Sequence, residues 1–450
     1  MPWEIEYLSL ISTVVGEWDG YLKKDITRND FKKIVNNFRN YNPPALHDED
    51  IDLEEELLPN ELLEYYFLRV AKTQLSHQNI IFNKFFRYNY FFTKDHNSNI
   101  NENFKEVFDL NYTKYVKFSV LLFLSICKLN NYSIDNVIKK VKGLDLFTNN
   151  EVEKMVEHLT DTRSNIVTVY NKFKGTDEKL KPYFYNPLKM KPIIKYNNEL
   201  YCPMPTLIFN AVTYGFYHWL CSEKDSFSQK FGENVFEDYI NYILKNWGDS
   251  SYKIIPEFKY YINKEEFKSP DFILVSKDKD LIFIEAKATT PSIKLISSNR
   301  SEYMKQLEKA YGVALEQCIK KNNHIKKGYL IHNDLPDYKN IDNIYYLIVT
   351  LERFHFPPSK HMLKNIIDIY KKKEKELIID INEEFHVVGV EGLENIIEFD
   401  NRNLFEYIEY RQNNDLTYRE FFEVNINNDI KFQDTNRYMF SKGLFEEMNK

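Results

Sequence analysis

Two apolar runs separated by a short charged segment constrain the fold of this chain more than any other feature. The runs cover residues 272–275 and 281–284, and the sequence KDKD at 277–280 between them is typical of a hairpin turn. Nearly continuous apolar residues are expected in central strands that are covered on both faces. The sequence therefore predicts a hairpin of two buried strands in the middle of a sheet.

The segments around this hairpin alternate between helical and strand patterns. Apolar residues at three- and four-residue spacing predict helices over 206–221, 228–246 and 302–320. Apolar runs predict further strands over 252–262, 329–332 and 344–351. A helix, three strands, a second helix and then further strands are typical of an α/β sandwich with a mixed central sheet.

The earlier part of the chain is predicted to be mainly helical. Helical spacing covers residues 30–38, 61–78, 114–129 and 151–159. Asn60 and Asn150 are the expected N-caps of the second and fourth of these helices. A short hairpin within 191–205 is predicted to turn at Asn197-Asn198, because Asn tolerates the positive φ that such turns require.

The length of 450 residues is more than one compact core normally organises, so we expect two or three domains. The first is a mainly α-helical N-terminal domain over 1–186, suited to sensing, substrate selection or partner binding. The second is an α/β core over 187–355 with a leading hairpin and helices. The third is a C-terminal α/β extension over 356–450, which includes a charged helix predicted over 361–376.

Composition excludes several classes of protein. A net charge of -7 argues against a protein that simply coats DNA, which would be basic overall, and is neutral toward an enzyme with acidic metal ligands. The four cysteines include no CxxC pair, which argues against a zinc ribbon or a disulfide framework. Glu4 and Glu6 occupy the place of a signal peptide's positive charge, and the apolar run at 120–127 is too short to span a bilayer. We expect a cytoplasmic protein that does not bind membranes.

Three charged residues flank the two buried strands. Asp271 opens the first strand, and Glu285 and Lys287 close the second on one face, because side chains alternate along a strand. A turn of three or five residues would place Asp271 across from Lys287, and an even number would break this register. Two carboxylates and an ammonium beside two buried strands are unfavourable unless they have partners, because burial removes them from water. A divalent metal would compensate, and oxygen ligands suit magnesium or manganese.

The pair Pro270-Asp271, followed by Glu285-Ala286-Lys287, resembles the signature of the PD-(D/E)xK nuclease superfamily. The resemblance covers roughly residues 228–351, and it implies a restriction-endonuclease-like core that hydrolyses phosphodiester bonds with Mg²⁺ or Mn²⁺. It implies that Asp271 and Glu285 are metal ligands and that the carbonyl of Ala286 completes the metal shell. Lys287 is then the catalytic lysine.

The resemblance extends to the neighbouring helices. FGENVFEDYI at 231–240 is similar to the glycine-to-glutamate helix of this superfamily, which implies that Glu237 is a further catalytic acid and metal ligand. Glu233 is the second choice, because residues four apart share a helix face. Gln306 and Gln317 are both candidates for the glutamine on the helix after the lysine strand. The lysine-rich segments at 320–327 and 371–375 are weaker candidates for phosphate contact.

Several functional hypotheses remain open at this stage. The expected activity is that of an endonuclease acting on DNA, with RNA as an alternative. A role in bacterial restriction or anti-phage defence, as a homodimer or with a defence-complex partner, rests on analogy with the family. One alternative is a catalytically silent nucleic-acid-binding or scaffold protein that retains the nuclease fold. Another is a subunit that is active only with its partner. In the simplest interpretation, Asp271 only opens a strand and Glu285 and Lys287 form a solvated pair.

Overall fold

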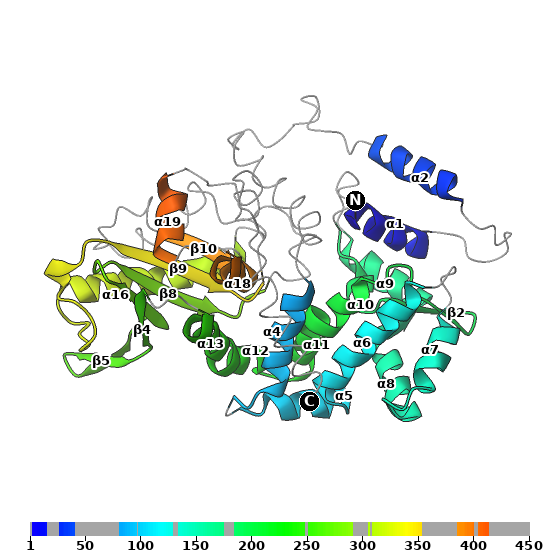
Figure 1. Ribbon diagram of the computed structural model, residues 1–450, viewed down its shortest axis with the longest axis horizontal. Coiled ribbons are helices and arrows are strands. Elements are labelled where there is room, and N and C mark those ends of the chain that lie inside the picture. The colour runs from blue at the N-terminus through cyan, green and yellow to red at the C-terminus, as the bar shows by residue number, and fades with distance from the viewer. Residues whose placement is uncertain are drawn as a thin grey trace. The chain divides into compact units, whose positions relative to one another are not determined.

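The computed structural model describes residues 2–15, 27–40, 81–96, 98–128, 134–174, 184–247, 251–290, 305–306, 308–352, 385–399 and 404–413. These residues form two compact units, and each unit combines segments that are distant in the sequence. The first contains the described residues of Met1–Ile81 and Glu102–Lys224. The second contains those of Phe82–Asn101, Asp225–Pro291 and Arg300–Lys450. Figure 1 labels the elements of both units.

This division differs from the segments expected at 1–186, 187–355 and 356–450. The hairpin and helices just after residue 186 belong to the first unit, whereas residues 82–101 belong to the second. The described residues after 384 also belong to the second unit. Contacts between distant segments set these boundaries. A local change in composition or in secondary-structure pattern does not reveal such contacts.

The first unit is mainly helical, which confirms the expectation of a helical N-terminal part. Its α-helices are α1 (Pro2–Val14), α2 (Arg28–Asn40), α5 (Ile100–Phe108), α6 (Tyr112–Ile126), α7 (Asp135–Lys142), α8 (Asn149–Leu159), α9 (Arg163–Phe173), α10 (Leu207–Asn210) and α11 (Phe216–Glu223). A 3₁₀ turn, η3 (Pro187–Lys189), and a π-helical turn, η4 (Ala211–Gly215), complete the helical elements described there. Strands β1 (Thr160–Thr162), β2 (Ile193–Tyr196) and β3 (Glu199–Tyr201) form a small sheet in the order β1-β2-β3.

Local sequence explains two features of this unit. Asn197 and Asn198 have φ values of 47° and 63° and connect β2 to β3, which confirms the predicted turn. Helix α8 begins with a capping box, in which the side chains of Thr148 and Glu151 bond each other's backbone N–H groups. The N-cap expected at Asn150 is therefore wrong, because Thr148 has the partner three residues later that the capping box requires.

The second unit contains a five-stranded mixed sheet, which confirms the α/β class. Its strands are β4 (Tyr252–Pro256), β7 (Phe272–Ser276), β8 (Leu281–Lys287), β9 (Ile344–Thr350) and β10 (Phe385–Gly389), in the order β10-β9-β8-β7-β4. β8, β9 and β10 are parallel, and β7 pairs antiparallel with both β8 and β4. Strands β5 (Lys259–Ile262) and β6 (Glu265–Lys268) form a separate hairpin.

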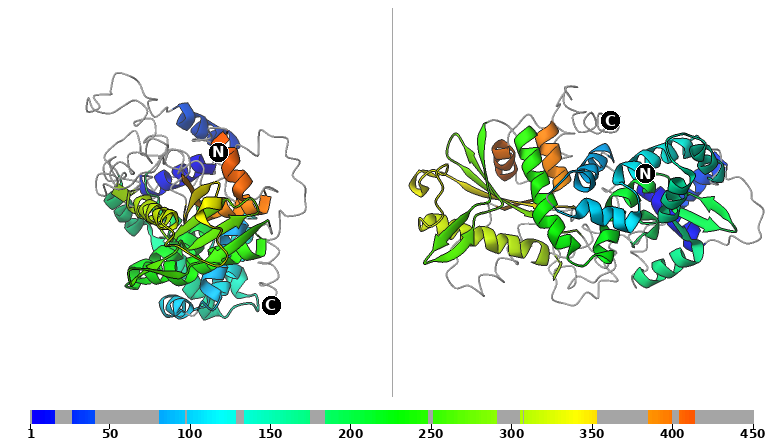
Figure 2. Two further views of the ribbon diagram at one scale, coloured as in Figure 1. Left: turned by 90° about the vertical axis from the view of Figure 1, so that its left-hand side faces the viewer. Right: turned by 90° about the horizontal axis from the view of Figure 1, so that it is seen from below.

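Helices cover both faces of the five-stranded sheet. The helical elements described in this unit are α4 (Ile81–Thr93), α12 (Phe227–Phe231), α13 (Glu237–Trp247), α16 (Val313–Lys326), α18 (Val390–Phe399) and α19 (Leu404–Asn413), with the π-helical turns η5 (Gly232–Phe236) and η6 (Glu308–Gly312) and the 3₁₀ turn η7 (Tyr338–Asn340). Figure 2 shows α16 on one side of the sheet and α13 and α18 on the other. Every residue of β9 is buried, as expected of a strand covered on both faces.

Two strand predictions are wrong. The segment predicted as one strand over 252–262 is two strands in different sheets, because the chain leaves the ladder after Pro256. Residues 329–332 form no strand, and Ile331 is 74% exposed. The helices predicted over 61–78 and 361–376, and the expected N-cap Asn60, lie outside the described residues. None of the described helices is both long enough and apolar enough to cross a membrane.

A buried ion pair joins distant segments of the second unit. Arg87 of α4 donates from Nε to Oε1 of Glu394 of α18 at 2.6 Å and from a terminal nitrogen to Oε2 at 2.7 Å. The hydroxyl of Tyr239 on α13 also donates to Oε1 of Glu394, at 2.7 Å. The Arg87 and Glu394 side chains are 1% and 0% exposed, so the pair is fully removed from water. These contacts fix α4 to the sheet unit although more than 300 residues separate the partners.

Candidate functional site

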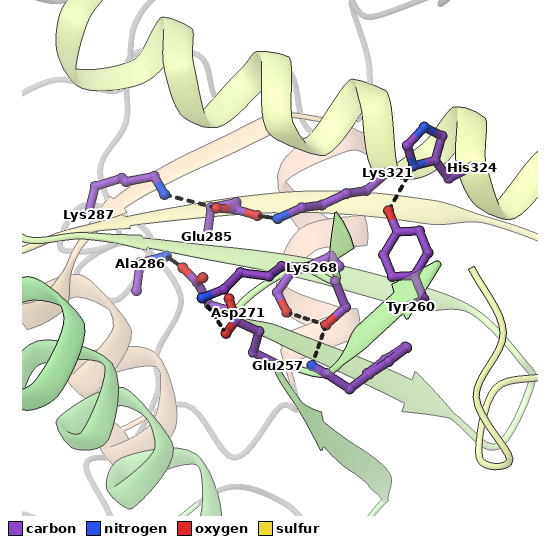
Figure 3. Close-up of polar contacts among 12 residues, drawn as sticks. Glu257, Tyr260, Lys268, Asp271, Glu285, Ala286, Lys287, Lys321 and His324 are labelled. Carbon is purple, nitrogen blue, oxygen red and sulfur yellow. Dashed lines mark hydrogen bonds and ion pairs between the residues drawn. The ribbon is translucent and has the colours of Figure 1, made fainter. Parts of the chain in front are cut away.

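Asp271 lies between β6 and β7, immediately before the first residue of β7, which is an inner strand of the five-stranded sheet. The preceding Ser269 anchors this position, because its N–H donates to the Phe258 carbonyl at 2.9 Å and its hydroxyl oxygen accepts from the Phe258 N–H at 2.9 Å. Asp271 is only 8% exposed, and its Oδ2 accepts a hydrogen bond from the backbone N–H of Ala286 at 2.7 Å (Figure 3). This bond ties the start of β7 to the end of β8.

The register of β7 and β8 differs from the predicted one. Val275 pairs with Leu281 and Phe272 pairs with Ile284, so five residues lie between the last paired residues and Asp271 is level with Glu285. Placing Asp271 across from Lys287 is therefore wrong by two residues. The turn closes early because the N–H of Ser276 donates to the Asp280 carbonyl at 2.9 Å and Lys279 adopts a φ of 68°.

Glu285 lies at the centre of the group and is 1% exposed. Its Oε2 accepts from the ammonium of Lys287 at 2.9 Å, and its Oε1 accepts from the ammonium of Lys321 on α16. Figure 3 shows the two lysines on opposite sides of this carboxylate. Lys321 belongs to the lysine-rich segment at 320–327, but a sequence pattern does not indicate which of these lysines points toward a strand of the sheet.

Glu237 joins this group and Glu233 does not. Glu237 is half-buried at the start of α13, and burial together with the negative charges of Asp271 and Glu257 raises its pKa to about 8. Glu233 is exposed and accepts a hydrogen bond from Gln229 of the preceding helical turn at 3.0 Å. The two side chains therefore differ in burial, although residues four apart share a face of a helix.

Gly232 allows this π-helical turn to approach the end of β8. A Cβ atom on Gly232 would lie 3.4 Å from the Cβ of Ala288, which is the lower limit of ordinary contact. The turn therefore packs directly beyond Lys287, the last residue of β8. The glycine identified in the sequence is explained by this close approach and not by an unusual backbone angle.

The charges in this group influence one another strongly. Burial and the negative charge of Glu285 raise the pKa of Asp271 to about 6. Burial alone would lower the pKa of Lys287, but the negative charges of Glu285 and Asp271 outweigh burial and raise it. Lys287 therefore remains an ammonium at neutral pH, whereas Glu237 is largely protonated there.

The two candidate glutamines lie on or before α16. Gln317 is half-buried one helical turn before Lys321, and its Oε1 is buried without a hydrogen-bond partner among the described residues. Gln306 is half-buried and lies in the short described stretch before η6. The involvement of either side chain in the site stays a prediction.

The donor atoms at this site fit a hard divalent cation in chemical type. Asp271, Glu285 and Glu237 offer carboxylate oxygens and Ala286 offers a carbonyl oxygen, which are ligands that Mg²⁺ and Mn²⁺ prefer. Burial is the main cause of the raised pKa values of Asp271 and Glu237, and the negative charge of neighbouring carboxylates adds to it. Within the described ranges, however, no three His, Cys, Asp or Glu side chains form a group that could hold a metal ion. Both oxygens of Glu285 are engaged by lysines instead.

Comparisons with models of protein families, with curated proteins and with solved structures find no match for this chain.

Proposed function

We propose that this protein is a metal-dependent nuclease with a PD-(D/E)xK type of centre in a restriction-endonuclease-like core, acting on DNA. The observation that supports this most is the pair of buried carboxylates, Asp271 and Glu285, beside the partly exposed Lys287 at neighbouring strand ends, with Glu237 on the preceding helix. Burying several ionisable side chains at one place is unfavourable unless they are paired or bind an ion, and such groups are frequent at active sites.

The order of elements supports the same proposal. An antiparallel hairpin, β7–β8, presents the charged group, and β9 then continues the sheet parallel to β8 after the crossover helix α16. Helices on both faces exclude water from the strands but leave the strand ends accessible, and Lys287 is 23% exposed. Among the described residues, these strand ends are where a phosphodiester could approach the group.

Four residues would hold the cation in this proposal. Asp271, Glu285 and Glu237 would contribute carboxylate oxygens, and Ala286 would contribute its carbonyl. When bound, Mg²⁺ or Mn²⁺ would neutralise charge on the scissile phosphate and lower the pKa of a bound water.

The side chains themselves have distinct roles. The raised pKa of Lys287 keeps its ammonium charged, so it stabilises negative charge on the phosphate oxygens and does not act as a base. The bond from the Ala286 N–H holds Asp271 in one orientation. Glu237 carries a proton at neutral pH in the metal-free protein and must release it before its carboxylate can bind a cation.

A second candidate function has an observation in its favour. Because ammonium groups occupy both oxygens of Glu285, this group must rearrange before Glu285 can bind a cation. A subunit that becomes active only with a partner, as a homodimer or in a defence complex, would show this arrangement when alone. A catalytically silent nucleic-acid-binding protein would show it permanently. The link to anti-phage defence rests on the resemblance of the motif alone.

A cleavage assay tests the proposal. Plasmid, linear and single-stranded DNA and RNA are incubated with Mg²⁺, Mn²⁺ or EDTA, using wild type, Asp271→Asn and Lys287→Met. Asp278→Asn and Lys277→Met are matched controls, since both residues are exposed on the turn between β7 and β8. We expect cation-dependent cleavage that both site variants lose and both controls retain.

The outcomes separate the candidates. Cleavage that survives Lys287→Met would show that the active centre lies elsewhere. Cleavage of RNA alone would correct the substrate class and leave the site in place. If no form cleaves, Mn²⁺ binding that depends on Asp271 favours the partner-activated subunit, and absence of binding favours the silent protein.

A further inference from the structure

Lys321 reaches the candidate site from a different element than the residues of the motif. It lies on α16, which packs on β8, and its side chain is 12% exposed. Its ammonium ion-pairs with Oε1 of Glu285, the oxygen that Lys287 does not contact. Glu285 is thus enclosed by two cations from two elements while it is 1% exposed.

The formal charges show why this second lysine matters. Asp271 and Glu285 contribute two negative charges when ionised, and Lys287 and Lys321 contribute two positive charges. This core is therefore neutral without a metal, and a divalent cation would leave it with an excess of positive charge in a water-poor environment. Such an excess is unfavourable unless an ammonium leaves the carboxylate.

The two lysines differ in how readily they can leave. Lys287 is two residues from Glu285 on the same strand, so its Cβ remains beside Glu285 whatever the side chain does. Lys321 is attached to a helix and reaches Glu285 only through its extended four-carbon stem. Rotation of that stem would withdraw its ammonium from Oε1 without any change in β8.

We propose that Lys321 is a built-in competitor for the divalent cation: in the metal-free protein its ammonium occupies Glu285, and the metal must displace it to bind. This inference rests on the proposed nuclease function and adds a means of regulating it. The competition weakens cation binding in the absence of substrate. A polyanion that attracts the displaced ammonium strengthens cation binding, so cation and nucleic acid bind cooperatively. Lys321 acts through Glu285 and is a positioning residue.

The test measures cation affinity and not cleavage. Mn²⁺ alone is titrated into the full-length, EDTA-treated protein and followed calorimetrically, for wild type, Lys321→Met and Lys321→Gln. Lys320→Met is the matched control, because it removes the same charge one residue earlier on α16. The ammonium of Lys320 pairs with Glu316 and not with Glu285, and the Lys320 side chain is 46% exposed. Lys321→Gln can still donate a hydrogen bond to Glu285, so it guards against a folding defect in Lys321→Met.

We expect Lys321→Met and Lys321→Gln to bind Mn²⁺ about tenfold more tightly than wild type. This is the effect expected if Lys321 leaves Glu285 free to bind the cation in only about a tenth of the wild-type molecules. Lys320→Met should bind like wild type. Thermal unfolding gives a second readout: without metal both Lys321 variants should melt below wild type, and Mn²⁺ should raise their melting temperature by more. If Lys321 had only a structural role, its replacement would instead weaken Mn²⁺ binding, which would contradict the proposed competition.

Two negative results have different meanings. If wild type binds Mn²⁺ and Asp271→Asn does not, but neither Lys321 variant binds more tightly, the competition is refuted and the proposed function stands. Equal tightening by Lys320→Met would also refute it, because a general charge effect would then explain the result. If no form binds Mn²⁺, the proposed metal-dependent function fails and this inference fails with it.

Discussion

The Arg87–Glu394 pair provides a sharp test of how the second unit is assembled. Arg87→Met would remove the guanidinium but keep most of the apolar stem, leaving the Glu394 carboxylate 0% exposed with only the Tyr239 hydroxyl as a donor among the contacts described above. Removing one partner of a buried ion pair destabilises a protein by about 3–5 kcal/mol. That is a large part of the total stability of a domain, which is about 5–15 kcal/mol.

A double-mutant cycle isolates the contribution of the pair. Glu394→Gln leaves a buried guanidinium with a neutral partner, and the double variant contains no unpaired charge. The double variant should therefore be more stable than the sum of the single effects predicts, by about 1–3 kcal/mol, as found for residues in direct contact. Lys142→Met, which breaks the partly exposed pair with Glu153, is the control and should change stability by less than about 1 kcal/mol.

Urea unfolding of the full chain measures these effects, and hydrogen exchange localises them. Because the chain has two compact units, exchange at the backbone amides of α4, α13 and α18 reports on the second unit alone. We expect faster exchange in all three helices for Arg87→Met. If only α4 exchanged faster, or if the two single effects simply added, α4 would not be an integral part of this unit and the reasoning would be refuted.

Three further predictions concern stability. Glu237 has a folded-state pKa of about 8 against an ordinary value of 4.5, so the metal-free folded protein holds a proton that the unfolded chain releases between these values. Its stability should therefore fall as pH rises from about 4.5 to about 8, and Glu237→Gln should flatten this fall in urea unfolding with EDTA. Thr148→Ala removes the N-cap of α8 and should destabilise the first unit by about 1 kcal/mol, and an unchanged urea midpoint would contradict the capping box. Leu347 lies in β9 and is 0% exposed, so Leu347→Ala should destabilise the second unit by about 2–5 kcal/mol in urea unfolding. A smaller loss of stability would mean that helices do not cover both faces of the five-stranded sheet.

Local patterns in the sequence were sufficient to predict the strands of the hairpin and the residues at their ends. The runs 272–275 and 281–284 within these strands are apolar along their whole length, so a local pattern is enough to locate them. The register was not predictable, because it depends on a turn in which Lys279 adopts a positive φ without being Gly or Asn.

Other features depend on contacts that no local pattern encodes. The choice between Glu233 and Glu237 depends on the burial of each side chain and on the charges around it, which their spacing in the sequence does not reveal. Lys321 pairs with Glu285 across 36 residues, and Arg87 pairs with Glu394 across 307. A single sequence shows which residues are charged, but it does not show which distant partner each of them meets.

The discontinuous second unit also has a consequence for synthesis on the ribosome. Arg87 emerges 307 residues before Glu394, and at about 5–20 residues per second the interval is tens of seconds. During this time Arg87 of α4 lacks its partner Glu394, and the ring of Phe91, fully buried in the finished unit, meets Phe231 and Tyr239 only after α12 and α13 have been synthesised. We expect this helix to need protection by a chaperone while translation continues. The hairpin with Asp271 and Glu285 is likewise synthesised before α18, so the proposed activity should require synthesis to have passed α18.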